Sequence, residues 1–339
     1  MSQNMRRTII LGTGHYTPER VVKNDDLATL MSTSDEWIQQ RTGIVERRMV
    51  DFENDPMGSA ELGARAGRAA LAKAGLAASD IELVIFCTLS PDRAFPGDGC
   101  LLQAKLDIPA GVPALDVRNQ CSGFLYGLAV GDAFIKNGTY SKVLLVGAEV
   151  HSSGLDFTDR GRDVAVIFGD GAAAVVLGAT EDPARGVLSV ELHADGRFAD
   201  ELTCTYPTST ESPRIRPERL EEGAQFPKMN GRNVFKHASV RMPEVVESVL
   251  AKNGLTAQEL KLLVPHQANL RISEMVQSRL GLREDQVFNN IQRYGNTTAA
   301  SIPLALSEAV DAGRVVKGDL VCLAAFGAGF TWAAALLRW

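Results

Sequence analysis

Residues 114–135 read ALDVRNQCSGFLYGLAVGDAFI: a short apolar run, a polar tripeptide, Cys121, and then a segment whose only charge is Asp132. That segment is too long for a strand and apolar on nearly all sides, so we predict a helix that is buried all round. Cys121 then lies at the N-terminus of the helix, where free backbone N–H groups favour a thiolate and can hold a substrate oxygen. Taken alone, the stretch leaves two interpretations open: a nucleophile for acyl transfer, or a small buried hydrophobic residue.

The composition limits the class of protein that can surround this helix. The chain has 339 residues, of which 45% are hydrophobic and 22% charged, so it can form two domains of an ordinary globular protein. Its net charge of −6 argues against a nucleic-acid or anionic-membrane surface, and no apolar run approaches the roughly 20 residues that span a bilayer. The five cysteines are odd in number and lack close pairing, which predicts neither disulfides nor a metal site and indicates the cytoplasm.

Strands alternate with helices along the rest of the chain, which predicts a layered α/β fold. A hairpin-like turn at 169–171 is expected to join two of the strands. Residues 182–228 are rich in Pro, Ser, Thr and charges, and we interpret them as an excursion between the halves or a covering lobe. The expected strands besides 114–117 are 8–11, 81–87, 142–148, 164–168, 172–177, 262–266, 287–291, 319–325 and 331–338.

The two halves of the chain share one order of parts: a strand, a second strand before a buried helix, a third strand, a Gly-rich turn and a last strand. This order predicts two similar units, residues 1–180 and 181–339, packed about a pseudo-twofold axis. Cys121 and Asn296 fall at equivalent places, each just before a buried helix. His266 falls at the carboxyl end of a strand, where open α/β sheets bind ligands. The three side chains are therefore expected to converge on one pocket.

Several separated motifs together are similar to one known family. They are Thr33–Ile38 with Arg41–Ile44, Asp116–Val117 before Cys121–Phe124, Phe168–Ala172, Pro265–Asn269, Gly295–Pro303, and Ala325–Gly327 through Gly329–Trp332. On these motifs the chain resembles the β-ketoacyl-acyl carrier protein synthase III family, condensing enzymes of the thiolase superfamily, over essentially its whole length. The resemblance implies a thiolase-like α/β fold with two similar βαβαβαββ halves in a layered α-β-α-β-α arrangement.

The resemblance also implies a reaction and its catalytic residues. An acyl-CoA primer would acylate Cys121, and malonyl-acyl carrier protein would then condense with it, releasing CoA and CO2 and initiating fatty acid synthesis. His266 and Asn296 would stabilise the enolate, and the backbone N–H groups of Cys121 and Ala328 would hold the oxyanion. No tightly bound cofactor and no metal is expected, because the CoA thioester is a substrate.

A further set of positions in the family pattern would contact CoA. A Trp can stack on a nucleotide base and an Arg can pair with phosphate, which on chemical grounds suits Trp37 and Arg41. The residues alone leave a second interpretation open, a surface helix whose Trp packs on the body of the protein. The matching arginine after the third strand is Arg162 by ungapped count, with Arg160 as the alternative. The expected CoA contacts are Trp37, Arg41, Thr42, Arg162, Gly231, Phe235 and Asn269.

Other positions would contact protein partners. Lys236 and Arg271 stand where the family offers cations to the acidic carrier protein. Phe95 corresponds to a residue that reaches into the acyl pocket of the second subunit, so a homodimer is expected. Neither nucleic acid nor membrane insertion is expected for this chain.

Three places depart from better-known members of the family. Arg118–Gln120 stand where relatives carry small residues, Ala328 replaces the middle of a common glycine triplet, and 204–228 is longer than in short members. They leave the primer open, so one alternative is a related acyltransferase or condensing enzyme of secondary metabolism with a longer or unusual primer. Two rivals from other classes are a non-catalytic scaffold or thiol sensor, and a nicotinamide oxidoreductase suggested only by Gly12 and Gly14.

Overall fold

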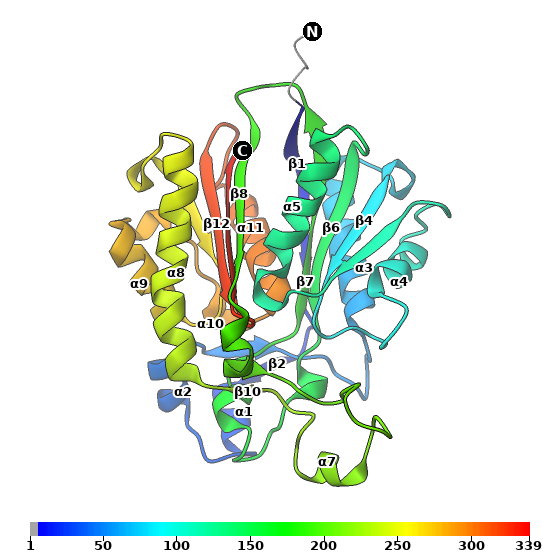
Figure 1. Ribbon diagram of the computed structural model, residues 1–339, viewed down its shortest axis with the longest axis vertical. Coiled ribbons are helices and arrows are strands. Elements are labelled where there is room, and N and C mark those ends of the chain that lie inside the picture. Colours follow the sequence, from blue (N-terminus) through cyan, green and yellow to red (C-terminus); the bar gives the residue numbers. More distant parts are fainter. Residues whose placement is uncertain (1–5) are drawn as a thin grey trace.

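Two mixed β-sheets stand side by side in the computed structural model, which describes residues 6–339 (Figure 1). The first sheet has the strand order β1-β7-β6-β4-β5, in which β6, β4 and β5 run parallel and β7 runs antiparallel to both its neighbours. Its strands are β1 Arg7–Tyr16, β4 Leu83–Cys87, β5 Ala114–Val117, β6 Lys142–Glu149 and β7 Gly171–Thr180. Residues 1–5, the start of the expected N-terminal unit, lie outside the described residues.

The second sheet repeats this pattern. Its order is β11-β12-β13-β8, with β11 and β12 parallel and β13 antiparallel to both its neighbours. An isolated parallel bridge between Leu263 and Val287 stands where β5 pairs with β4 in the first sheet. The internal repeat is therefore present in the fold. The strands are β8 Gly186–Ala194, β11 Leu262–Pro265, β12 Leu320–Gly327 and β13 Thr331–Arg338.

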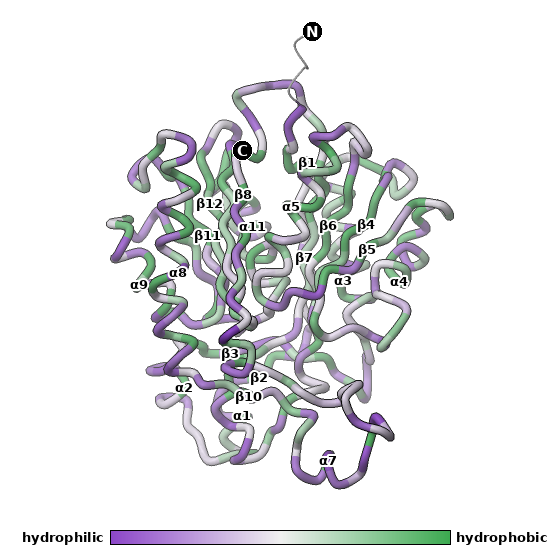
Figure 2. Tube along the Cα trace, viewed as in Figure 1, coloured by the Kyte–Doolittle hydropathy of each residue, from purple (hydrophilic) through white to green (hydrophobic). Residues whose placement is uncertain are grey.

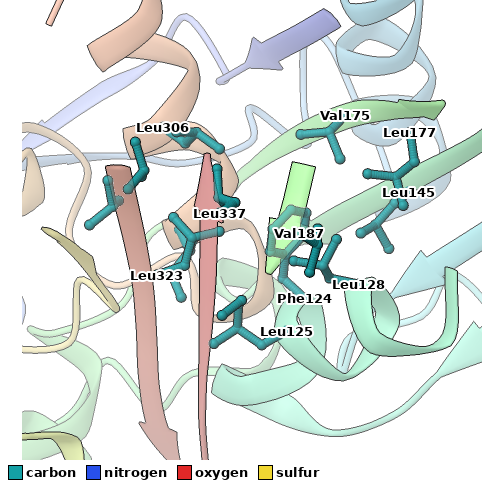
Figure 3. Close-up of a cluster of buried hydrophobic side chains, with 14 of the residues drawn as sticks. Phe124, Leu125, Leu128, Leu145, Val175, Leu177, Val187, Leu306, Leu323 and Leu337 are labelled. Carbon is teal, nitrogen blue, oxygen red and sulfur yellow. The ribbon is translucent and has the colours of Figure 1, made fainter. Parts of the chain in front are cut away.

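Two helices lie between the sheets and form the centre of the core. Side chains of α5 (Gly123–Lys136) and α11 (Ser301–Asp311) meet side chains of both sheets in one buried cluster (Figure 3). Phe124 and Leu128 come from α5, and Leu306 comes from α11. Because α5 faces apolar side chains on both flanks, it is hydrophobic nearly all round, as its sequence predicts.

Helices also cover the outer faces of the sheets. α3 (Ser59–Ala74) and α4 (Asp98–Lys105) cover the first sheet, and α8 (Gly231–Lys252) and α9 (Leu270–Leu280) cover the second. The order of layers is α-β-α-β-α, so the expected architecture is confirmed. Figure 2 shows hydrophobic residues concentrated along the strands and the helices that face them.

Gly12 and Gly14 are explained by this packing. Both lie within β1, and a Cβ at either position would collide with the backbone of Ala70 in α3. The two glycines therefore let the alanine-rich helix approach the strand closely. They do not form the strand-to-helix turn of a dinucleotide site, because β1 continues to Tyr16.

Short elements from both halves close one end of the sheets, at the bottom of Figure 1. Their bounds are β2 Val21–Lys23, α1 Asn24–Ala28, α2 Asp35–Thr42, β3 Glu46–Arg48, α6 Arg162–Ala165, β9 Leu202–Thr203, α7 Pro217–Glu221, β10 Lys228–Met229 and α10 Ile291–Tyr294. The strand β8 lies in the polar stretch 182–228, where the sequence analysis placed none. It is an edge strand paired only with β13, and its last three residues are exposed.

Two expected strands are wrong. Residues 162–165 form α6, and Phe168 makes only a bridge to Asn296, so no hairpin forms at 169–171. This segment packs against the second half of the chain instead, where Gly169 lies so close to the Tyr294 carbonyl that a Cβ would not fit. Of 287–291, only Val287 pairs. Further along, Gln267 Oε1 accepts the backbone N–H groups of residues 290 and 291 at 3.0 and 3.2 Å, and the chain turns into α10.

Candidate active site

One cavity of about 420 Å³ is lined by residues of both halves. Cys121, His266 and Asn296 all line it, although they come from the start of α5, the end of β11 and the turn before α11. The expected convergence of the three side chains is therefore confirmed. The chemistry they can perform depends on the partners of each reactive atom.

Cys121 lies in the 3₁₀ turn Gln120–Ser122 that leads into α5, and its side chain is buried. Gln120 has a left-handed φ of 41°, so the chain turns sharply just before the cysteine. The end of β12 packs on it, since a Cβ at Gly327 would lie 2.5 Å from Cys121 Cβ and 3.0 Å from Sγ. This approach, which only glycine permits, brings the backbone N–H of Ala328 to the sulfur.

The thiol of Cys121 is protonated at neutral pH. Burial raises its pKa to about 12, and the Glu149 carboxylate acts in the same direction. The backbone N–H groups of Ala328 and Cys121 lower the pKa, but they do not outweigh burial. The backbone N–H groups therefore favour the thiolate, as expected, but burial outweighs them, and the thiol needs a proton acceptor when it attacks.

His266 offers such an acceptor. Its Nδ1 lies 2.6 Å from Ser301 Oγ, whose hydroxyl donates to the Thr298 carbonyl at 2.9 Å. Because a carbonyl only accepts, Nδ1 carries the ring proton and donates to Ser301. Burial lowers the pKa of His266 to about 3, so the ring is neutral. Its Nε2 is buried without a hydrogen-bond partner among residues 6–339, and it carries a lone pair.

Asn296 presents a donor to the same space. Its Oδ1 accepts the Thr298 N–H at 2.8 Å, which fixes the amide orientation. Its backbone is held on both sides, by the Ile167 carbonyl at 2.9 Å and the Gly169 N–H at 3.1 Å. The Nδ2 group is therefore left as the free donor of this side chain. An acceptor, a donor and a thiol thus line one cavity.

One of the aromatic side chains that line the cavity is Trp37 on α2. The Arg41 and Arg162 guanidinium carbons lie 4.7 and 4.9 Å from its ring centroid. Arg160 points elsewhere: it pairs with Asp156 at 2.5 Å and lies over the Phe226 ring. The geometry thus favours Arg162 over Arg160 as the arginine beside Trp37. Arg162 does not line the cavity itself, whereas Trp37 and Arg41 do.

Four more of the expected CoA contacts, Thr42, Gly231, Phe235 and Asn269, line this cavity. Two of them also serve the local structure. Thr42 Oγ1 donates to the Ile38 carbonyl at 2.7 Å. Asn269 caps α9, and its amide donates to the Arg41 carbonyl at 2.9 Å, so it joins α9 to α2 at the entrance.

The expected partner-contact residues lie on the surface. Lys236 is exposed on α8, and Arg271 is exposed at the start of α9 with its guanidinium over the Phe235 ring. Arg271 also lines the cavity, and Lys236 does not. Phe95 is 84% exposed in the loop between β4 and α4, which is unusual for so large an apolar side chain.

The three departures from the family pattern lie close to the cavity. Ala328 is not among the non-glycine residues of 6–339 with positive φ, so its backbone suits alanine as expected. Gln120, the last residue of Arg118–Gln120, adopts the left-handed turn before Cys121. The 204–228 loop is closed at its base by pairing of β9 with β10, whose Leu202 and Met229 line the cavity.

Sequence reasoning missed Glu149, Thr298 and Ser301. Glu149 is fully buried, and burial raises its pKa to about 7 despite hydrogen bonds from Ser90, Leu89 and neighbouring groups. A lone carboxyl at the carboxyl end of a buried strand was the available signal. Thr298 and Ser301 stand in the quoted motif Gly295–Pro303, but their contacts depend on a turn that periodicity does not reveal.

Residues 6–339 contain neither a candidate metal site nor a candidate membrane span. No group of three or more His, Cys, Asp or Glu side chains is placed to hold a metal ion. Within the same residues, no helix is both long and apolar enough to cross a bilayer.

The five-layer duplicated fold and the Cys–His–Asn cavity define a thiolase-fold condensing enzyme. Two models of the 3-oxoacyl-[acyl-carrier-protein] synthase III family match, one over residues 115–196 and its C-terminal part over 250–339. The β-ketoacyl-[acyl-carrier-protein] synthase III of Rhodospirillum centenum is 47% identical over 337 residues, covering 98% of this chain and 99% of the relative. The chain therefore belongs to the 3-oxoacyl-[acyl-carrier-protein] synthase III family.

Solved structures of similar proteins have the same fold as this chain. The 3-oxoacyl-[acyl-carrier-protein] synthase III of Aquifex aeolicus superimposes with a TM-score of 0.89 at 41% identity, over 98% of this chain and all of that one. The priming β-ketosynthase of the R1128 polyketide pathway superimposes with a TM-score of 0.87 at 30% identity, over all of this chain and 98% of that one. The thiolase fold is therefore shared with both.

Proposed function

We propose that this enzyme condenses an acyl-CoA primer with malonyl-acyl carrier protein and so initiates fatty acid synthesis. The products are β-ketoacyl-acyl carrier protein, CoA and CO2. The observation that carries the proposal is the cavity in which a buried thiol, an unpartnered imidazole nitrogen and a free amide donor meet. Acyl carrier protein is proposed as the carrier because the similar proteins are named acyl-carrier-protein synthases.

In the first half-reaction Cys121 becomes acylated. The sulfur attacks the thioester carbonyl carbon as His266 Nε2 takes the thiol proton, so that the imidazolium forms only together with the oxyanion. The N–H groups of Cys121 and Ala328 hold the oxyanion, where one such donor is typically worth roughly 10²–10³ in rate. The bond from carbon to the CoA sulfur then breaks, and the imidazolium returns the proton to the CoA thiolate. CoA leaves, and the acyl-Cys121 intermediate remains.

In the second half-reaction the malonyl thioester oxygen accepts hydrogen bonds from Asn296 Nδ2 and His266 Nε2. For this the ring changes tautomer, and the Ser301 hydroxyl, which can accept or donate, turns to donate to Nδ1. CO2 departs, and its bonding electrons form the enolate. The enolate carbon attacks the acyl-Cys121 carbonyl, the carbon–sulfur bond breaks, and the cysteine sulfur takes one proton from solvent.

The cavity entrance suits the nucleotide end of CoA. Trp37 offers an aromatic face, and Arg41 and Arg162 offer cations for phosphates. Gly231 and Phe235 form the opposite wall, and Asn269 stands beside the pantetheine path. CoA enters as a substrate in this proposal, and no tightly bound cofactor or metal takes part.

The partners and the compartment are part of the same proposal. Lys236 and Arg271 dock the acidic carrier protein near the entrance. A homodimer forms in which Phe95 of each subunit enters the acyl pocket of the other, and its 84% exposure in the single chain supports this. All five cysteines are free, which fits a reducing cytoplasm.

Intact-mass measurement tests the acyl enzyme. We expect one acyl mass on the protein after incubation with acetyl- to dodecanoyl-CoA, and none on Cys121→Ala. Addition of labelled malonyl-acyl carrier protein should then release labelled CO2 and restore the unmodified mass. A protein that no acyl-CoA modifies contradicts the proposal and favours a non-catalytic scaffold.

A second candidate is a condensing enzyme of secondary metabolism with a longer or unusual primer. The observations in its favour are the likeness to a polyketide priming enzyme and the long 204–228 loop, whose base borders the cavity. The primer series distinguishes the two candidates, because strong preference for a long or branched acyl group supports the second. Acylation without CO2 release would instead indicate acyl transfer to another nucleophile.

A further inference from the structure

We propose that His151 is a positioning residue for condensation, acting through Thr298 on both Asn296 and His266. The proposal rests on the proposed function and extends it to a histidine that does not line the cavity. His151 follows β6, so it belongs to the first half, whereas the residues it positions belong to the second.

Thr298 contacts Asn296 directly and His266 through Ser301. Its N–H donates to Asn296 Oδ1 at 2.8 Å and so turns Nδ2 toward the cavity. Its carbonyl accepts from Ser301 Oγ at 2.9 Å, and Ser301 in turn contacts His266 Nδ1 at 2.6 Å. The two backbone groups of one residue therefore fix the orientation of the Asn296 amide and, through the Ser301 hydroxyl, the position of the His266 ring. A rotation of Thr298 disturbs both at once.

The backbone of Thr298 does not favour this arrangement by itself. Its φ is 48°, in the left-handed region that β-branched residues rarely adopt. Such a conformation is unfavourable for a β-branched residue and persists only where the surroundings impose it. The Thr298 side chain is buried, and its hydroxyl has one partner among residues 6–339, His151 Nε2 at 2.5 Å.

His151 is rigid enough to impose the conformation. Its backbone N–H donates to Asp170 Oδ1 at 2.7 Å, and its ring packs on the Phe168 ring with centroids 4.7 Å apart. Asp170 is fixed in turn by the Val50 N–H at 2.8 Å and by the Ser152 hydroxyl. Burial lowers the pKa of His151 to about 3, so the ring stays neutral across the physiological range.

Packing alone does not require a histidine here. A leucine could fill the same buried space, whereas the imidazole must lose water and keeps its place through a hydrogen bond to the hydroxyl. The bond from His151 to Thr298 is therefore the feature to test. The two variants His151→Leu and Thr298→Val remove it from opposite sides with little change in volume.

The test separates the two half-reactions. Acylation of Cys121 by acetyl-CoA is followed by quench and intact mass, and condensation by release of labelled CO2 from malonyl-acyl carrier protein. Acylation uses only His266, whereas condensation uses His266 and Asn296 together. We expect His151→Leu to slow acylation about threefold or less and condensation about 30-fold. A purely structural defect lowers both by one factor, because it only reduces the folded fraction.

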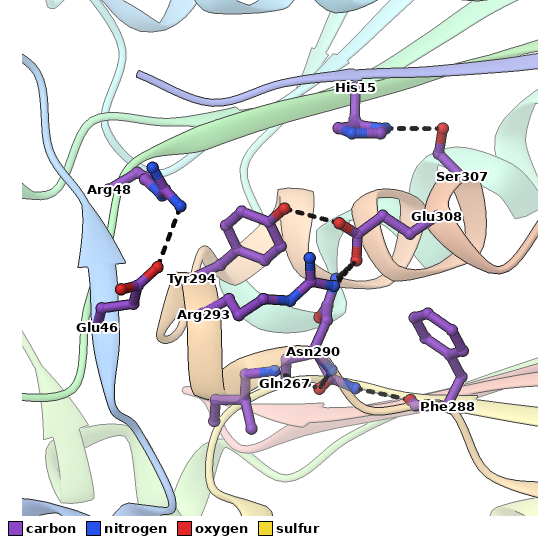
Figure 4. A network of polar contacts seen from close by, with 11 residues as sticks. His15, Glu46, Arg48, Gln267, Phe288, Asn290, Arg293, Tyr294, Ser307 and Glu308 are labelled. Carbon is purple, nitrogen blue, oxygen red and sulfur yellow. Dashed lines mark hydrogen bonds and ion pairs between the residues drawn. The ribbon is translucent and has the colours of Figure 1, made fainter. Parts of the chain in front are cut away.

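Further variants sharpen the result. Thr298→Val should reproduce the split, and the double variant should be no slower than either single one, because both remove the same bond. Thr298→Ser keeps the hydroxyl and should restore most of the condensation rate. The matched control is His15→Leu. His15 Nδ1 lies 3.0 Å from the Oγ of Ser307, which is on α11 like Ser301 but does not line the cavity (Figure 4). The control variant should change neither step.

The outcomes are distinguishable. If His151→Leu and Thr298→Val keep the wild-type ratio of condensation to acylation, this proposal is wrong and the proposed function stands. If the wild-type protein is acylated but releases no CO2, the proposed function is wrong, and the positioning role falls with it. If His151→Leu does not fold, Thr298→Val and the Ser rescue decide the question.

Discussion

Gly327 and Cys121 approach each other so closely that no side chain fits between them. A Cβ at position 327 would lie 2.5 Å from Cys121 Cβ and 3.0 Å from Sγ. This contact brings the end of β12, and with it the Ala328 N–H, to the start of α5. The pair of backbone N–H donors at the sulfur therefore comes from both halves of the chain, Cys121 from the first and Ala328 from the second.

The first prediction follows from this contact. Gly327→Ala must push β12 away from Cys121, so the Ala328 N–H no longer reaches the oxyanion. Loss of one such donor typically costs roughly 10²–10³ in rate, and we expect at least a hundredfold slower acylation by acetyl-CoA in stopped-time mass measurements. The control is Gly154→Ala, where an added Cβ meets nothing within 4 Å. A Gly327→Ala enzyme acylated at the wild-type rate would contradict this account.

The second prediction concerns the thiol pKa. Glu149 raises it, and the carboxylate is charged only above its own pKa of about 7. Glu149→Gln should therefore lower the thiol pKa and speed alkylation of Cys121 by iodoacetamide several-fold at pH 8–9. Below pH 6 the two proteins should react alike, because Glu149 is then neutral in the native enzyme. Equal pH profiles would show that Glu149 does not act on the thiol.

How much of the site is visible in the sequence depends on the range of the interaction. Cys121, His266 and Asn296 were found because each follows a local pattern, a strand end or the start of an apolar helix, and because the pattern repeats in the second half. The family motifs then added Trp37 and the other entrance residues. The layers followed from periodicity, since a helix apolar on all sides needs a sheet on each flank.

The misses come from interactions between distant segments. The thiol was expected to favour ionisation, because the helix N-terminus is readable locally, but burial and Glu149 depend on the assembled core. Residues 164–168 have strand-like composition, yet Phe168 forms only an isolated β-bridge, with Asn296 of the other half. The roles of Thr298 and His151 likewise rest on a left-handed turn and a contact across 147 positions.

The third prediction is a pH-dependent stability. Burial raises the pKa of Asp98 from 3.8 to about 6, with Asp92 and Asp116 adding negative charge nearby. The folded state then binds more protons than the unfolded state between these values, so the free energy of unfolding falls as pH rises from about 4 to 6. The contribution is of order 3 kcal/mol, since one pKa unit corresponds to about 1.4 kcal/mol.

Asp98→Asn should flatten this dependence, because the amide does not titrate. Urea unfolding at several pH values measures it, and the difference between variant and wild type should grow in the variant's favour as pH rises from 4 to 6. The amide keeps an oxygen for the Asp92 N–H and can still meet Ser59. Parallel curves for the two proteins across this window would rule out Asp98 as the titrating group.

The last prediction concerns the entrance. Trp37 lies against the guanidinium groups of Arg41 and Arg162, and we expect the nucleotide of CoA to use its ring face. Stacking of a base on an aromatic ring is worth about 1–3 kcal/mol, so Trp37→Leu should raise the KM for acetyl-CoA about tenfold or more. The maximal acylation rate should stay nearly unchanged, because the lost binding is equal in ground and transition states. Acetyl-pantetheine, which lacks the nucleotide, should react equally with both proteins. Trp332→Leu is the matched control, since Trp332 also lies against an arginine, Arg241 at 5.3 Å, but outside the cavity lining. If Trp37→Leu weakens both substrates alike, the ring serves the structure of α2 and not the nucleotide.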